Sequence, residues 1–174
     1  MTQKIDFAKL DLQDALDLAI LIEEEAKERY QEFQKIVGGR YKGDASDIFR
    51  NMAVNEGKHH AQLVARRQKL FKDAPRRVDR SWFEEVEAPD RGTPRVFMGP
   101  KQAFQVALES EEKAHDFFAE ALPHLKDPEV RKLFEELKGE EIQHQNYIKK
   151  AMAKLPAGPD VEEEDADAPG SDAG

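Results

Sequence analysis

The stretch FRNMAVNEGKHHAQL, residues 49–63, decides the fold, because a similar stretch, FEELKGEEIQHQNYI, follows at residues 134–148. Aligning the two superposes Glu56 on Glu141, and in both copies a histidine follows the glutamate three positions later. Apolar side chains recur at three- and four-residue spacings in each copy, which predicts a helix with one buried face. The glutamate and the histidine share that face, because residues i and i+3 are neighbours on a helix.

A second internal match relates the other two helical segments of the chain. Residues 12–34 align with residues 100–122, which superposes Glu23 on Glu111 within similar apolar patterns. Each of these acids is centred on the apolar face of its helix at about 100° per residue. The sequence therefore predicts that four acids and two histidines meet inside one bundle, namely Glu23, Glu56, His59, Glu111, Glu141 and His144.

Helix start and stop signals divide the chain into four long helices. We expect them over residues 12–37, from Asp44 or Ser46 to 72, 100–122 and 128–155. Short links join the first pair and the last pair, which favours two antiparallel hairpins. Residues 73–99 are long enough to cross the length of the bundle, with a short helix expected near Ser81–Glu85.

The predicted fold is therefore an all-α, ferritin-like antiparallel four-helix bundle, with two helical hairpins joined by a long crossover. It occupies residues 1–155. Residues 156–174 are acidic and rich in Gly, Pro and Asp, which predicts a disordered tail.

Composition excludes several classes of function. A formal net charge of −9 argues against a nucleic-acid surface, which needs a basic patch. The absence of cysteine excludes disulfides, thiolate metal sites and iron–sulfur clusters. No apolar run approaches the ~20 residues of a membrane span, and the N-terminus lacks a signal-peptide pattern, so we expect a cytoplasmic protein.

Metal binding explains why acids occupy these buried faces. An ionised carboxylate in a core is costly unless it is paired or bound to a cation, and lysine and arginine are scarce on the same faces. Two divalent cations would balance four carboxylates. The oxygen and imidazole ligands suit iron or manganese, with zinc as an alternative. A third Glu-x-x-His pattern, Glu112 to His115, lies off the central line of its helix and is interpreted as a coincidence.

The chain resembles the rubrerythrin branch of the ferritin-like di-iron superfamily over residues 12–155. The motifs that carry the resemblance are Glu23-Glu-Glu-Ala-Lys-Glu-Arg-Tyr30, Glu56-Gly-Lys-His59, Glu111-Glu-Lys-Ala114 and Glu141-Ile-Gln-His144. The resemblance implies two iron ions bridged by Glu56 and Glu141, with the other four residues as further ligands. It also implies that Tyr30 lies beside the site, and that the protein forms an antiparallel homodimer.

Two departures from the family pattern bear on function. Rubrerythrins carry an additional glutamate where this chain has Ala114, and they usually carry a rubredoxin domain with four cysteines, whereas this chain has no cysteine. A peroxidase cycle would therefore need a separate electron donor.

Three hypotheses of function follow. The first is redox chemistry at a di-iron centre with peroxide or dioxygen, of the peroxidase or ferroxidase type, in oxidative stress or iron handling. The second is a non-catalytic protein for iron binding, storage or delivery. The third is a metal-free bundle that serves as a scaffold for a partner. The sequence leaves the native metal open.

Overall fold

Four long α-helices dominate the computed structural model, which describes residues 5–158 and 160. They are α1 (Leu12–Val37), α2 (Ala45–Phe71), α3 (Pro100–Ala121) and α4 (Pro128–Met152). Three short 3₁₀ helices accompany them, η1 (Phe7–Lys9), η2 (Arg80–Trp82) and η3 (Leu122–His124). The described residues contain no strand, which confirms the all-α prediction.

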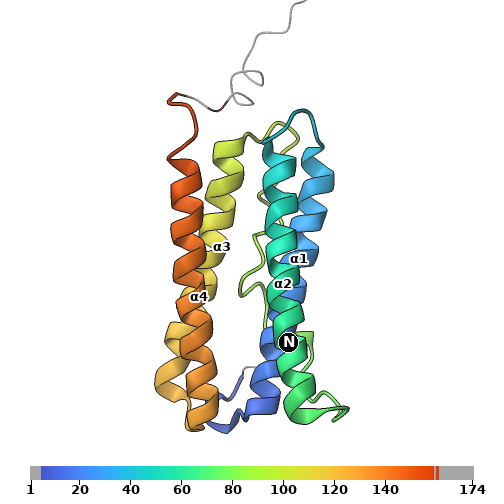
Figure 1. The fold of residues 1–174 in the computed structure, drawn as a ribbon, viewed down its shortest axis with the longest axis vertical. Helices are drawn as coiled ribbons and strands as arrows, with labels where there is room; N and C mark the ends of the chain where they lie inside the picture. The colour runs from blue at the N-terminus through green and yellow to red at the C-terminus, as the bar shows by residue number, and fades with distance from the viewer. Residues whose placement is uncertain (1–4, 159, 161–174) are drawn as a thin grey trace, which may run out of the picture.

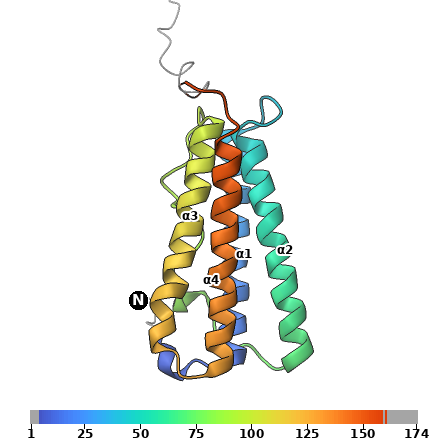
Figure 2. The ribbon, with the colours of Figure 1, turned by 60° about the vertical axis from the view of Figure 1, so that its left-hand side comes forward.

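The helices form two antiparallel hairpins, α1 with α2 and α3 with α4 (Figure 1). The crossover leaves α2 at the lower end of the bundle in Figure 1 and returns to the upper end, where α3 begins. Consequently α2 and α3 run in the same direction, and Figure 2 shows the four helices lying side by side along one axis. The ferritin-like four-helix topology is confirmed.

Aspartates cap the start of three of the four long helices. The Asp11 carboxylate accepts a hydrogen bond from the backbone amide of Asp14 in α1, and the Asp127 carboxylate accepts hydrogen bonds from two backbone amides in the first turn of α4. At the start of α2, Asp44 Oδ1 accepts a hydrogen bond from the backbone amide of Asp47 at 3.0 Å. Of the two predicted caps, Asp44 and Ser46, the aspartate is therefore the one observed. Helix α1 ends at Gly38, whose φ of 65° lies in the region that glycine tolerates best.

The start of α3 is capped by a residue far away in the sequence. Gly99 has no side chain to offer, and Asp160 Oδ2 accepts the backbone amide of Gln102 at 3.1 Å. Asp160 is buried there. It falls within the tail predicted to be disordered; residues 159 and 161–174 of that tail lie outside the described residues.

Two apolar clusters fill the core, one toward each end of the bundle, and they are called the lower and the upper cluster after the ends of the bundle in Figure 1. The first contains Leu16, Phe118 and Phe134 together with the residues around them, and η1 packs onto it through Phe7. The second contains Phe33 and its edge-on neighbour Phe49, 5.4 Å away between ring centroids, along with the upper parts of all four helices. Between the two clusters, every helix contributes polar residues to the interior.

A buried ion pair joins α1 to the end of α2. Arg67 Nε donates to Asp17 Oδ1 at 2.9 Å, and both side chains are buried. The same guanidinium donates to the carbonyl oxygens of Lys72 and Ala74, so it also closes the carboxyl end of α2 and fixes the start of the crossover. Among the described residues, no helix combines the length and hydrophobicity needed to cross a membrane.

Candidate metal centre

A layer of acids and histidines separates the two apolar clusters. In α1 the lower cluster ends at Ile22 and the upper cluster begins at Tyr30, so the layer lies between these two residues. Each of the other three helices likewise leaves one cluster and enters the other near its middle. All four predicted acids are buried, with exposed fractions of 0–5%. The six residues that the sequence predicted to meet in this layer are Glu23, Glu56, His59, Glu111, Glu141 and His144.

Each hairpin supplies one Glu–Glu–His group. In the first hairpin, His59 Nδ1 lies 3.5 Å from Glu56 Oε2 and 3.8 Å from Glu23 Oε2. The potential ligand atoms of these three residues lie within 4.8 Å of one another. The helix period explains this arrangement, because Glu56 and His59 occupy successive turns of α2 and α1 brings Glu23 to the same height.

The second hairpin repeats the arrangement. His144 Nδ1 lies 3.0 Å from Glu111 Oε2 and 3.4 Å from Glu141 Oε2. The two imidazole rings stack at 4.5 Å between centroids with an interplanar angle of 3°. The internal repeat of the sequence therefore becomes an approximate two-fold relation between the hairpins.

Unpartnered oxygens show that this layer fits a metal. Carboxylate oxygens from all four helices are buried there without a hydrogen-bond partner, although buried carboxylates normally find one. Paired cations would satisfy these oxygens, and the mixed carboxylate and imidazole donors suit iron, manganese or zinc. The residues that leave such oxygens are Glu23, Glu56, Glu87, Glu111 and Glu141.

The electrostatics of the layer reflect crowded negative charge. Burial, with repulsion between neighbouring carboxylates, raises the pKa of Glu23 and of Glu111 well above the usual range. Burial would also raise the pKa of Glu56, but the nearby His59, whose Nδ1 lies 3.5 Å from Glu56 Oε2, together with Glu87 and His144, outweighs it and lowers that pKa. Bound cations would oppose the rise in pKa of Glu23 and Glu111, because a ligating carboxylate must be deprotonated.

The histidine of the second group responds to the same charges. Burial alone would lower the pKa of His144, but its hydrogen bond with Glu111 and the negative charge of Glu141 nearby outweigh that effect and raise the pKa to about 10. Without a cation, this ring carries a proton at neutral pH and acts as a counter-charge to the acids. Metal binding would release that proton, since a ligating imidazole nitrogen must be deprotonated.

Glu87 is a fifth acid of the layer, and the sequence analysis missed it. It comes from the crossover, its side chain is 2% exposed, and its ligand atoms lie within 4.8 Å of those of Glu56 and Glu111. The crossover has no helical period that would assign its side chains to a face. One hint in the sequence is that Val86 and Ala88 flank the acid within a polar segment.

Tyr30 lies beside the layer, in the upper apolar cluster. Its side chain is fully buried, and its ring stacks on Phe49 at 6.1 Å. Burial and the nearby carboxylates of Glu111 and Glu56 raise the pKa of the phenol well above 10, so the hydroxyl stays protonated and can donate a hydrogen bond. Helix α3 offers Phe118 at the equivalent position of the repeat, and that side chain lies in the lower cluster.

A pocket reaches the centre between α2 and α4. Its volume is about 400 Å³, and the histidines at its inner end are about one-fifth exposed. Small molecules and ions can approach the layer from this side. The residues that line the pocket are Met52, Asn55, Glu56, His59, Glu111, Gln143, His144, Tyr147 and Ile148.

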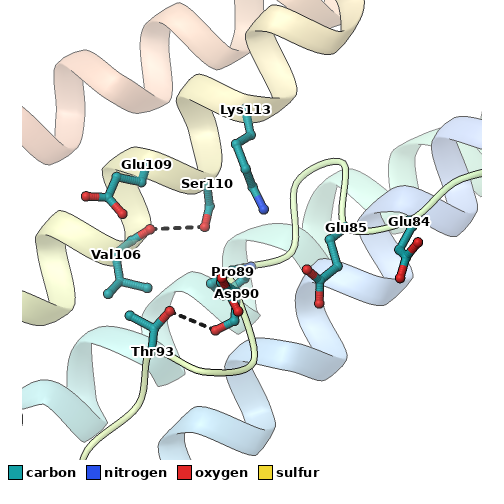
Figure 3. A pocket seen from close by; sticks show the side chains of 9 residues that line it. All are labelled: Glu84, Glu85, Pro89, Asp90, Thr93, Val106, Glu109, Ser110 and Lys113. Atoms are coloured by element: carbon teal, nitrogen blue, oxygen red, sulfur yellow. Dashed lines mark hydrogen bonds between the residues drawn. The ribbon is translucent and has the colours of Figure 1, made fainter.

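A second pocket, of about 550 Å³, lies between the crossover and α3 (Figure 3). None of the six predicted ligands lines it. In Figure 3 the Lys113 side chain extends from α3 toward the crossover, and its Nζ donates to the carbonyl oxygen of Ala88 at 2.8 Å. The pocket therefore borders the segment that carries Glu87 rather than the ligands themselves.

Comparison with known proteins places the chain among di-iron bundles. A family model described as Rubrerythrin matches residues 14–95 and 102–169. The fold resembles that of an uncharacterized conserved protein from Magnetospirillum magnetotacticum MS-1, with a TM-score of 0.64 and 26% identity over 86% of this chain and 99% of that chain. A hypothetical protein from Pyrococcus furiosus gives a TM-score of 0.48 and 18% identity over 83% of this chain and 89% of that one. No curated protein matches the chain.

Proposed function

The chain belongs to the rubrerythrin family of di-iron proteins, and from this premise we propose that it catalyses redox chemistry with peroxide or dioxygen, as a peroxidase or a ferroxidase. One observation supports the proposal above the others. Two Glu–Glu–His groups face each other in one buried layer, and their acids keep oxygens without hydrogen-bond partners. The proposed ligands of the iron pair are Glu23, Glu56, His59, Glu111, Glu141 and His144.

Bound iron would supply two metal ions that exchange electrons with the oxidant. The surrounding residues would control which molecules reach them. The apolar clusters above and below the layer exclude bulk water along the bundle axis, while the pocket between α2 and α4 admits small molecules. Tyr30 would hold a proton near Glu111 and could donate it as a hydrogen bond to a bound oxidant or to a ligand.

A peroxidase cycle would require a separate electron donor, because the chain has no cysteines to hold an iron–sulfur or rubredoxin centre. A donor that binds over the opening of the pocket between α2 and α4 would lie close to His59 and His144. The homodimer stays a prediction, which light scattering of the purified protein would check.

Rapid mixing of the loaded protein tests the proposal. Metal-free protein receives two Fe²⁺ per chain without oxygen and is then mixed with peroxide or with dioxygen in separate experiments. We expect iron oxidation well above the rate of free Fe²⁺ with at least one oxidant. The double substitution Glu56→Ala and Glu141→Ala should abolish this, whereas Glu112→Ala, an exposed neighbour within the coincidental third motif, should not.

The same experiment separates the alternative function. Binding of two iron ions per chain with no acceleration by either oxidant would favour iron storage or delivery over catalysis. No binding of iron, manganese or zinc would contradict both proposals and favour the metal-free scaffold.

A further inference from the structure

The crossover adds to the metal layer one carboxylate that does not come from any of the four helices, that of Glu87. We propose that Glu87 is an additional metal ligand, so that the centre has five carboxylates and two imidazoles. This proposal rests on the proposed function, since it assigns a further residue to the same metal pair.

The position of Glu87 fits a ligand that spans the two hairpins. The two Glu–Glu–His groups each lie within one hairpin, whereas the group of Glu87 with Glu56 and Glu111 draws on α2 and α3. All three side chains are buried, with Glu56 and Glu111 at 0% exposure, and Glu87 Oε1 has no hydrogen-bond partner. A carboxylate at this point faces both halves of the layer.

The backbone around Glu87 is held from both sides. From α1, Arg29 Nη1 donates to the carbonyl oxygen of Pro89 at 2.5 Å and to Glu85 Oε1 at 2.8 Å. From α3, Lys113 Nζ donates to the carbonyl oxygen of Ala88 at 2.8 Å. These contacts hold the backbone on both sides of Glu87, so its side chain already lies in the layer before a metal binds.

The backbone conformation near Glu87 indicates that this placement has a cost. Glu85 has a φ of 47°, which lies in the left-handed region that residues other than glycine seldom adopt. Such conformations persist where surrounding contacts impose them, and here Arg29 holds both Glu85 and Pro89. The contacts of Arg29, rather than local sequence, therefore impose the turn that directs Glu87 into the layer.

The two cationic side chains that hold the backbone beside Glu87 are engaged with other groups. The guanidinium of Arg29 pairs with Glu85, Glu25 and Glu32, and the Lys113 ammonium is used on a backbone carbonyl. An additional buried acid among four others is costly without a counter-charge. A metal pair at the centre of the layer would provide that charge.

A second role for Glu87 must be distinguished by experiment. As a neutral acid it could donate a hydrogen bond to Glu56 and orient that ligand without touching the metal. Glutamine keeps the shape and a hydrogen-bond donor but loses the anionic oxygen. Glu87→Gln should therefore preserve a positioning role and remove a ligand role.

Titration of metal-free protein with Co²⁺ provides the test, with binding followed by calorimetry and by visible absorption. We expect wild type and Glu84→Gln, an exposed acid of the same segment, to bind two Co²⁺ per chain with the same spectrum. Glu87→Gln should weaken at least one binding step by about tenfold or more, since the loss of even an outer-shell partner costs about 10–100-fold. Its visible bands should also change in position or intensity, because one cobalt ion loses an oxygen ligand.

Three outcomes would overturn the proposal in different ways. If Glu87→Gln binds two Co²⁺ with wild-type affinity and spectrum, Glu87 is not a ligand, while the proposed function stands. If wild type binds no Co²⁺, Fe²⁺ or Mn²⁺, both proposals are wrong. If Glu87→Gln binds Co²⁺ more weakly but keeps the visible bands of wild type, Glu87 supports the site without ligating the metal.

Discussion

Residues at equivalent positions of the repeat can have different surroundings. Glu56 and Glu141 superpose in the sequence, yet Glu56 and not Glu141 belongs to the group that the crossover acid Glu87 forms with Glu111. Glu111 and Glu23 are also equivalent, and burial among neighbouring carboxylates raises the pKa of both. The approximate two-fold relation therefore holds for the four acids of the helices but not for Glu87, which has no equivalent in the repeat.

The raised pKa of His144 predicts how stability of the metal-free protein depends on pH. A pKa raised from 6.5 to about 10 on folding stabilises the native state fully below pH 6.5, and this contribution is lost as pH rises through about 10. The raised pKa of an acid such as Glu23 likewise makes the stability of the native state fall as pH rises above the pKa of that acid in the unfolded chain. We expect Tm in metal-free buffer to fall by several degrees between pH 6.5 and 9.5, at about 2–4 °C per kcal/mol.

Two histidine variants check the origin of this effect. His144→Gln should flatten the fall in Tm, whereas His124→Gln, in the exposed turn before α4, should leave it unchanged. A Tm that stays level or rises over this range in the wild type would contradict the assignment. Differential scanning calorimetry with a chelator present provides the measurement.

At the scale of the elements, the crossover is organised by arginines. Arg29 reaches it from α1 and is itself 2% exposed, while Arg80 extends from the crossover to Glu28 and Glu24 on the surface of α1. Both arginines pair with glutamates, but in very different environments. Only the buried one holds the segment that carries Glu87.

Substitution of Arg29 should loosen the crossover. We expect Arg29→Met to lower the free energy of unfolding by about 3 kcal/mol, the lower end for breaking a buried ion pair, since Glu85 and Glu32 are partly exposed. Arg80→Met should cost less than about 1 kcal/mol, as expected for an exposed pair. Urea unfolding of the metal-free variants measures both, and equal losses would contradict the difference in burial.

Hydrogen exchange would show where the Arg29 variant loosens. Faster exchange of backbone amides at residues 83–89 with unchanged exchange in the middle of α3 would agree with a local anchor. A uniform acceleration along all four helices would indicate that Arg29 supports the bundle as a whole.

At the scale of the whole molecule, the layer lies between two hairpins that pack more closely within themselves than against each other. Ligands from both hairpins meet there, so a metal pair would join them at mid-height. Metal binding should therefore contribute to global stability as well as to chemistry.

Metal addition should raise Tm of the wild type. A ligand that binds the native state at about 100 times its Kd contributes about 2.7 kcal/mol per site, which corresponds to about 5–10 °C for a chain of this size. The double variant Glu56→Ala and Glu141→Ala should show no rise with Mn²⁺, and Glu112→Ala should behave as wild type. An equal rise in all three proteins would place the metal elsewhere.

Helical periodicity allowed much of this molecule to be predicted from its sequence. The bounds of α1 agree with the predicted ones, and the other helices differ by a few residues at their ends, where α4 stops at Met152 rather than continuing to Leu155. The expected short helix of the crossover is the single turn Arg80–Trp82. The six candidate ligands could be found because a helix repeats every 3.6 residues, so spacing alone states which side chains share a buried face.

The crossover was decided by tertiary structure, because an irregular segment has no period that assigns its side chains to a face. Glu87 enters the layer because Arg29 and Lys113, distant in sequence, hold the carbonyl groups beside it. Asp160 caps α3 for a similar reason, since Gly99 leaves that position without a side chain. Local sequence thus determined the four helices and their inward acids, whereas contacts between distant residues determined what the irregular chain adds to them.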